Sequence, residues 1–128
     1  MKPNKLRPRD PDRVRHMVEA AEWLVLESQG INLAALLQDR RLHRALEREF
    51  EILGEAAAHV SAETQQLWPG VPWLVLKNYR NFIAHEYFRP DYADMLYSAQ
   101  VLLPPILPEL RLMLAATDAE FGPDANLI

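Results

Sequence analysis

Apolar residues recur at three- and four-residue steps over residues 14–25 and again over residues 42–60, which is the spacing of one face of an α-helix. No segment alternates apolar and polar residues for long enough to form a β-strand. A chain with this pattern buries its apolar stripes by packing helix against helix. We therefore expect an all-α fold, an up-and-down bundle of four to five helices.

Residues typical of helix ends bound the first two helices. Asp10 can cap a first helix, and Gly30 ends it. An apolar connector over residues 31–37 follows. The second helix is expected to begin at Asp39 and to end at Ser61.

Prolines divide the second half of the chain. Residues 68–72 contain two prolines and a glycine and are expected to form a rigid turn. A third helix should then run from Trp73 to about Glu86, and a fourth from Asp91 to about Leu103. Further prolines interrupt the fourth helix before a last helical piece ends at Leu112. The buried stripe of the third helix is expected to comprise Leu76, Tyr79, Phe82 and Ile83.

With 128 residues, 49% of them apolar, the chain can form one hydrophobic core. We expect a basic arm at residues 1–9, a single helical domain at residues 10–116 and a frayed tail at residues 117–128. Cysteine is absent, which excludes disulfides and thiol catalysis. No apolar run approaches the ~20 residues of a membrane span, and no secretory signal is visible, so a cytoplasmic location is expected.

Charge and missing motifs exclude several function classes. The formal net charge of -4 argues against broad adhesion to nucleic acid, although residues 1–15 are basic and the remainder is acidic. Any contact with RNA must therefore be local. The 4 glycines lie too far apart for a phosphate-binding loop, and no two histidines have the spacing of a zinc protease motif.

One segment, Lys77 to Tyr87, combines residue types that suit phosphate chemistry. On a continuous helix, Lys77, Asn81 and His85 stand four residues apart and form a polar stripe beside the apolar one. Arg80 and His85 are five residues apart, so they can converge on one bound group without touching each other.

The chemistry of these side chains fits RNA cleavage. The guanidinium of Arg80 can hold a phosphate, and the imidazole of His85 can move protons near neutral pH. RNA supplies its own nucleophile, the 2′-hydroxyl, so a base, an acid and a cation suffice. The structural alternative is that His85 only interacts with the dipole of its helix C-terminus and that Arg80 is a solvated surface residue.

The residues R-N-F-I-A-H-E-Y, Arg80 to Tyr87, resemble the R-x-x-x-x-H-x-Y signature of the HEPN ribonucleases, in particular the HepT-like toxins. Two further blocks agree with that family: D-P-D-R-V-R-H-M-V-E-A in the expected first helix and L-E-R-E-F-E-I-L-G-E-A-A in the second. V-P-W before the motif and H-E-Y-F-R-P-D after it also agree. The resemblance thus runs from about Asp10 to Leu110.

This resemblance implies a homodimeric, HEPN-like bundle that cleaves RNA without a metal or other cofactor, with two copies of the motif facing each other. Arg80 and His85 would be the catalytic pair, and Asn81 the polar residue that follows the arginine. Lys77 is a further supporting candidate from the polar stripe. Toxins of this type are similar in being paired with a small nucleotidyltransferase antitoxin, which attaches AMP units to the motif tyrosine, here Tyr87.

A dimer would also resolve a chemical difficulty. Transfer of the phosphate needs a base for the 2′-hydroxyl and an acid for the leaving 5′-oxygen, whereas each chain offers one His85. Two chains supply both groups. The expected partners are therefore an RNA substrate, a second copy of the chain and a small nucleotidyltransferase, with no membrane.

Other polar and aromatic residues are interpreted as structural. The remaining histidines are expected to be surface or packing residues, and four arginines of the second helix a solvated face, with RNA contact as the alternative. Two glutamates at i,i+4 could hold a metal, but structural or interface roles are preferred. The tryptophans are assigned to the core or a dimer interface. These residues are His16, His43 and His59; Arg40, Arg41, Arg44 and Arg48; Glu51 and Glu55; and Trp23, Trp68 and Trp73.

Two function classes remain beside the ribonuclease. One is a non-cleaving helical module whose motif binds a nucleotide or a protein partner. The other is a bundle that serves only structural dimerisation. Incubation of the purified protein with RNA in excess chelator separates the first reading from both alternatives.

Overall fold

The computed structural model describes residues 10–82 and 91–121 of the chain. Every regular element in these two ranges is helical, which confirms the all-α prediction. Three long helices form the body of the molecule: α1 (Asp10–Ser28), α3 (Arg40–His59) and α7 (Leu107–Phe121). Four short helices join them: α2 (Leu33–Gln38), α4 (Ala62–Leu67), α5 (Trp73–Asn78) and α6 (Tyr92–Tyr97).

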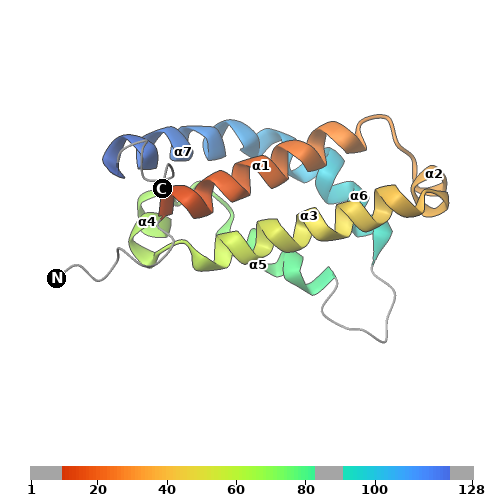
Figure 1. Cartoon of the computed structure of the whole chain (residues 1–128), viewed down its shortest axis with the longest axis horizontal. Helices are drawn as coiled ribbons and strands as arrows, with labels where there is room; N and C mark the ends of the chain where they lie inside the picture. The colour runs from red at the N-terminus through yellow and green to blue at the C-terminus, as the bar shows by residue number, and fades with distance from the viewer. Residues whose placement is uncertain (1–9, 83–90, 122–128) are drawn as a thin grey trace.

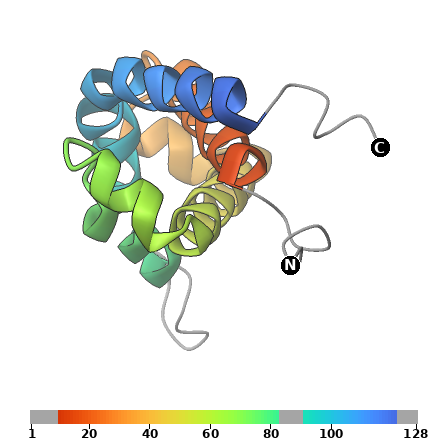
Figure 2. The same cartoon turned by 90° about the vertical axis from the view of Figure 1, so that its left-hand side faces the viewer.

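Helix α1 lies between α7 and α3 and packs against both (Figure 1). The apolar stripes read from the sequence meet along these two contacts, so burial of helix faces drives the packing. The α5 helix lies on the side of α3 remote from α7, as both views show (Figures 1 and 2). Fully buried side chains of this core include Val14, Met17, Leu24, Leu46, Phe50, Leu53, Leu110 and Met113.

The caps of the long helices explain where they begin and end. Asp39 caps α3 as predicted, because its carboxylate accepts a hydrogen bond from the main-chain N–H of Leu42 at 3.0 Å. Gly30 follows α1 with a φ of 73°, a left-handed conformation that glycine adopts without strain. Asp10, predicted to cap the first helix, is instead the first residue of α1 and ties it to α4. Its carboxylate accepts hydrogen bonds from the main-chain N–H and hydroxyl of Ser61 and from the hydroxyl of Thr64.

Two short helices correct the sequence prediction. The expected connector over residues 31–37 contains α2, whose N-cap Asn32 accepts from the main-chain N–H of Ala35 at 2.8 Å. Ser61 lies just beyond the end of α3, as predicted, but it also caps α4, which the sequence analysis omitted. Residues 68–72 are without helix, in agreement with the predicted turn.

The third helix is shorter than predicted. The α-helical part, α5, ends at Asn78 and continues as a 3₁₀ turn at Tyr79–Phe82. Leu76 and Tyr79 are buried and Phe82 is half-buried, as expected of the apolar stripe. The end of the predicted helix, from Ile83 to Glu86, lies outside the described residues.

The fourth helix changes geometry along its length. Asp91 caps α6, and the chain continues as a π-helical turn at Ser98–Leu102 and a 3₁₀ turn at Pro104–Ile106. Pro104 has no N–H to continue the ladder, so it helps to end the regular helix here. Within the π turn, the side-chain amide of Gln100 donates to the carbonyls of Ser28 and Ile31, each at 2.7 Å, and so caps the end of α1.

The last helix extends to Phe121, past the predicted end at Leu112 and past the start of the expected tail at Thr117. Thr117 is buried, and its hydroxyl donates to the carbonyl of Leu114 at 3.1 Å. Asp118 pairs with Arg15 of α1 at 3.1 Å. The burial of Thr117 and the ion pair of Asp118 with α1 hold the helix beyond the point where the sequence indicates fraying.

No single helix of the described part is long and apolar enough to cross a bilayer. By length and composition alone, the pair Tyr92–Leu102 and Pro104–Ala119 passes this test together, although it is bent by 41°.

Candidate functional site

The 3₁₀ turn at Tyr79–Phe82, here called the motif turn, carries Arg80 and is anchored by aromatic packing on α3. In a 3₁₀ turn the side chains at i and i+3 are nearly eclipsed. Tyr79 and Phe82 accordingly stack with ring centroids 5.4 Å apart. Both rings meet the buried Phe50 edge-on, at 4.8 Å and 5.1 Å. The two aromatic residues thus fix the turn and leave Arg80 and Asn81 exposed between them.

Gly54 of α3 permits the motif turn to approach this closely. A Cβ at this position would lie 2.7 Å from Cγ of Arg80, 2.9 Å from its main-chain nitrogen and 3.1 Å from the carbonyl oxygen of Leu76. Cβ atoms are essentially never found closer than 3.0 Å to another heavy atom, and 3.1 Å is tighter than most of their contacts. Only glycine at position 54 therefore allows the main chain of Arg80 to lie this close to α3.

Glu55, the next residue of α3, holds the head group of Arg80. Nη1 of Arg80 lies 3.1 Å from Oε1 of Glu55, and both side chains are about half exposed, at 47% and 54%. An exposed ion pair of this kind is worth at most about 1 kcal/mol and is screened by salt. A phosphate can therefore displace Glu55 from Arg80 at small cost.

The other predicted site residues are placed only in part. Lys77, in the last turn of α5, is half-buried, and Asn81 is exposed on the motif turn. The predicted spacing of the polar stripe assumed one continuous α-helix, and it ceases to apply beyond Asn78 because the turn there is 3₁₀. His85 and Tyr87 lie outside the described residues.

Burial affects the acidity of Tyr79, the residue before Arg80. It raises the pKa of the phenol, and the nearby Ser98 hydroxyl lowers the pKa by a smaller amount. Tyr79 therefore stays neutral at physiological pH and serves as a packing residue of the motif turn.

Sequence reasoning missed the roles of Gly54 and Glu55. A glycine inside an otherwise regular helix usually marks a close approach of another segment, so Gly54 was a usable signal. Glu55 was considered only together with Glu51. Each of these glutamates pairs with a different arginine: Glu51 with Arg48 at 3.1 Å, and Glu55 with Arg80. Among the described residues, no group of three or more histidine, cysteine, aspartate or glutamate side chains could hold a metal ion.

Two of the remaining histidines, His43 and His59, and two tryptophans, Trp68 and Trp73, have structural contacts. The ring of His43 packs on Tyr92 at 4.7 Å, and Nδ1 of His59 lies 2.8 Å from the main-chain oxygen of Glu55. Nε1 of Trp73 donates to the carbonyl of Trp68 at 2.9 Å, which fixes the turn before α5. These contacts agree with the packing roles expected for them.

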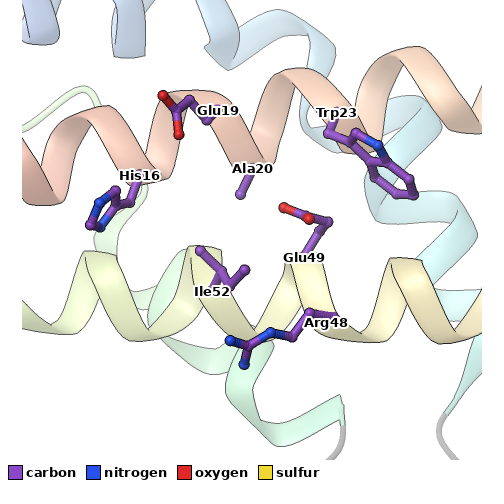
Figure 3. Close-up of a pocket in the computed structure, with 7 residues that line it drawn as sticks. All are labelled: His16, Glu19, Ala20, Trp23, Arg48, Glu49 and Ile52. Atoms are coloured by element: carbon purple, nitrogen blue, oxygen red, sulfur yellow. The ribbon is translucent and has the colours of Figure 1, made fainter.

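A groove of about 520 Å³ runs between α1 and α3, and Figure 3 shows the side chains around it. Glu19 belongs to α1 and Glu49 to α3, where Glu49 points toward α1 and Arg48 points away from it (Figure 3). Burial raises the pKa of Glu49, Arg48 opposes this rise, and Glu19 adds to it. The groove is lined by His16, Glu19, Ala20, Trp23, Arg48, Glu49 and Ile52. It does not include Arg80 and is distinct from the motif turn.

Comparison with known proteins gives a consistent family. A family model described as "Ribonuclease HepT-like" matches residues 14–113. The chain is similar to a "Putative RNase" of Caldanaerobacter subterraneus subsp. tengcongensis, with 32% identity over 62% of this chain and 70% of the relative. It is also similar to a "Putative RNase" of Methanocaldococcus jannaschii, with 25% identity over 76% of this chain and 89% of the relative.

A third relative has the more specific name "Probable ribonuclease HepT" and comes from Thermococcus cleftensis. It is 29% identical over 62% of this chain and 73% of its own length. No solved structure matches the chain.

Proposed function

The chain belongs to the HepT-like ribonuclease family, and we propose that it cleaves RNA as a metal-independent endoribonuclease through Arg80 and His85. The observation that carries this proposal is the placement of Arg80. Its main chain is fixed against Gly54, while its guanidinium is exposed and pairs with the displaceable Glu55. A phosphate-binding arginine needs this combination of a fixed main chain and an accessible guanidinium.

The proposed reaction is an internal transfer of the RNA phosphate. One His85 accepts the proton of the 2′-hydroxyl as that oxygen forms a bond to phosphorus. The bond from phosphorus to the 5′-oxygen breaks, and a second His85 donates a proton to this leaving oxygen. Arg80 stabilises the negative charge that grows on the phosphate oxygens. The products are a 2′,3′-cyclic phosphate and a 5′-hydroxyl.

Asn81 and Lys77 have supporting roles in this proposal. Asn81 is exposed beside Arg80 and can hydrogen-bond a phosphate or sugar oxygen of the substrate. Lys77 adds positive charge one turn before Arg80. The second His85 comes from a second copy of the chain, so we propose a homodimer with the two motifs facing each other.

Regulation is proposed to act on Tyr87. The chain would be the toxin of a toxin–antitoxin pair, and a small nucleotidyltransferase would attach AMP to the Tyr87 hydroxyl. The added phosphate could pair with Arg80 and occupy the space that the RNA phosphate needs. Support for this part comes from the resemblance of the motif alone.

The test is cleavage of a defined RNA in excess chelator. We expect wild-type protein to leave a 2′,3′-cyclic phosphate, and RNA with methylated 2′-hydroxyls to resist. Arg80→Ala and His85→Ala should each lower the rate by at least about 100-fold, the usual contribution of such groups. The matched controls are Arg111→Ala, which also removes an exposed, ion-paired arginine, and His16→Ala, which removes an exposed histidine.

Three results would overturn the catalytic assignment: a metal requirement, normal cleavage of methylated RNA, or full activity of His85→Ala. Binding of RNA without any cleavage would favour the non-cleaving module instead. For the regulatory part, mass spectrometry of protein co-expressed with the nucleotidyltransferase should find added AMP on Tyr87. Tyr87→Phe should keep cleavage and escape silencing, and AMP on another residue would contradict this part.

A further inference from the structure

The outer face of α3 carries a row of arginines that neither the core nor the motif turn uses. Arg40, Arg41, Arg44 and Arg48 are all exposed. At 3.6 residues per turn they fall within about 100° of the helix circumference, and residues four apart are separated by about 6 Å along the axis. Arg40, Arg44 and Arg48 therefore follow one another along the N-terminal half of α3, and Arg41 lies beside Arg40 on the same face. These four residues are here called the arginine row.

The arginine row does not stabilise the helix that carries it. Cations near a helix N-terminus are opposed by the helix dipole, and the first turn of α3 holds no acidic residue. Within residues 10–82 and 91–121, Arg40, Arg41 and Arg44 form no ion pair. Arg48 pairs with Glu51, and this ion pair is exposed. Residues that break a local rule of helix stability in this way are typical of binding surfaces.

The row leads to the motif turn. Glu51 and Glu55 fall within the same arc of α3 as the arginines, farther toward its C-terminus. Glu55 is about 10 Å along the axis from Arg48, and it binds Arg80 at 3.1 Å. The guanidinium of Arg80 therefore lies on the same side of α3, beyond the C-terminal end of the arginine row, with Glu51 and Glu55 between them.

We propose that Arg40, Arg41, Arg44 and Arg48 bind consecutive backbone phosphates of single-stranded RNA and direct the strand to Arg80. This inference rests on the proposed function and names the part of the substrate outside the cleaved bond. Arginines whose helix positions are about 6 Å apart along the axis suit a phosphate chain, and residues on one face of a helix can follow one strand. Because the net charge of the chain is -4, contact with RNA is expected to be local, and the arginine row offers such a local site.

A second copy of the chain is the competing occupant, since the acidic half of the same face could pair with the arginines of an antiparallel α3. The composition of the face favours RNA. None of the exposed large apolar residues of the described part belongs to α3. Stable protein interfaces need an apolar, well-packed centre.

The experiment measures binding of a fluorescent 2′-O-methyl oligoribonucleotide over a range of salt concentrations, because this RNA binds without being cleaved. Arg40→Gln/Arg44→Gln should weaken binding about tenfold and reduce the slope of log affinity against log salt by about 1.4, or 0.7 per lost phosphate contact. Arg13→Gln/Arg111→Gln removes the same charge from α1 and α7 and should leave the slope unchanged. The melting temperature of the first variant should equal or exceed that of wild type, because the two arginines oppose the helix dipole.

Unchanged affinity and slope in Arg40→Gln/Arg44→Gln would overturn the proposal, as would an equal loss in the control variant. Loss of the dimer with RNA binding intact would assign the row to a protein interface instead. The proposed function fails separately. If the wild type binds RNA with the expected salt slope but never cleaves unmodified RNA, the role of the arginine row stands and the ribonuclease proposal fails. If it cleaves RNA but the arginine variant binds as wild type does, the ribonuclease proposal stands and the role of the row fails.

Discussion

Gly54 is the residue whose replacement the site tolerates least. Its Cα faces the main chain of Arg80 and the carbonyl of Leu76, and neither group can move without displacing the motif turn. Elsewhere in a helix, glycine is about 1 kcal/mol less favourable than alanine. The position of Gly54 therefore reflects the contact between α3 and the motif turn, at a cost to the helix itself.

Gly54→Ala should destabilise the protein although it improves helix propensity. Overpacking of a tight contact costs about 1–3 kcal/mol, whereas the gain in helix propensity is about 1 kcal/mol. We expect a cost in the upper part of that range, because the contact involves main-chain atoms. Cleavage should fall at least tenfold because Arg80 moves with its backbone. Thermal melts and an RNA assay measure the two effects.

The matched control for this substitution is Gly70→Ala. A Cβ there would meet only the flexible carboxylate end of Glu109, at 3.2 Å. Its melting temperature should stay close to that of wild type. A Gly54→Ala protein more stable than wild type would show that the contact with Arg80 is not close.

Glu55→Gln is expected to separate substrate binding from the chemical step. In the free protein Arg80 must leave Glu55 before it binds a phosphate, and an exposed pair is worth at most about 1 kcal/mol. Removing the charge should therefore lower KM for RNA by up to about fivefold, with little change in stability. Glu22→Gln, which breaks the exposed pair with Arg111, should leave KM unchanged. A higher KM for Glu55→Gln would mean that Glu55 positions Arg80 rather than competes for it.

At the level of the helices, length decided what the sequence could predict. The 19 residues of α1 and the 20 residues of α3 contain enough turns to show the apolar period. The 6-residue helices α2 and α4 contain fewer than two turns, so only their caps, Asn32 and Ser61, could have indicated them.

The motif turn was misread for a different reason. An i,i+3 apolar pair such as Tyr79 and Phe82 fits both an α-helix and a 3₁₀ turn, so spacing alone could not place the change of geometry. The exposure of Arg80 and Asn81 agrees with their predicted location on the polar side. The contact of Arg80 with Glu55 could not be predicted, because it joins elements 25 residues apart through tertiary packing.

The aromatic contacts of the motif turn give a prediction at this scale. Phe50 of α3 is fully buried against the motif turn, whereas Phe82 of the motif turn is only half-buried. Phe50→Ala should cost about 3–5 kcal/mol, and Phe82→Ala clearly less, in urea denaturation. The expected place of Phe82 in the buried stripe would predict the full cost for this residue as well. Equal losses for the two variants would mean that Phe82 gains further burial in the assembled protein.

For the molecule as a whole, the exposed outer face of α3 carries the arginine row, whereas the side of α3 that packs on α1 carries a glutamate. The arginine row lies on the outer face, while the side toward α1 brings Glu49 close to Glu19 in the groove (Figure 3). Partial burial raises the pKa of Glu49 most, Arg48 partly opposes this rise, and repulsion by Glu19 adds to it. The principal helix contact of the fold thus carries a charge that weakens it at neutral pH.

Glu49→Gln should therefore stabilise the protein at neutral pH, with an effect that disappears in acid. Because burial raises the pKa of Glu49 in the folded state, the folded protein retains this proton at pH values where the unfolded chain has lost it. Stability falls as pH rises from the ordinary value of 4.5 through the folded pKa, and the loss persists at pH 7. The glutamine variant has no such loss. Its melting temperature should exceed that of wild type by at most about 2 °C at pH 7, since solvent in the open groove screens the charge, and should match it near pH 4.

The control is Glu27→Gln, which removes an equal charge from an exposed position of α1. An acidic protein can gain stability from any lost carboxylate through reduced self-repulsion, so the two variants must be compared over the same pH range. A pH-dependent gain that is larger in Glu49→Gln assigns the effect to the groove between α1 and α3. If both variants gain equally, general charge repulsion accounts for the result, and the packing of α1 on α3 does not depend on the ionisation of Glu49.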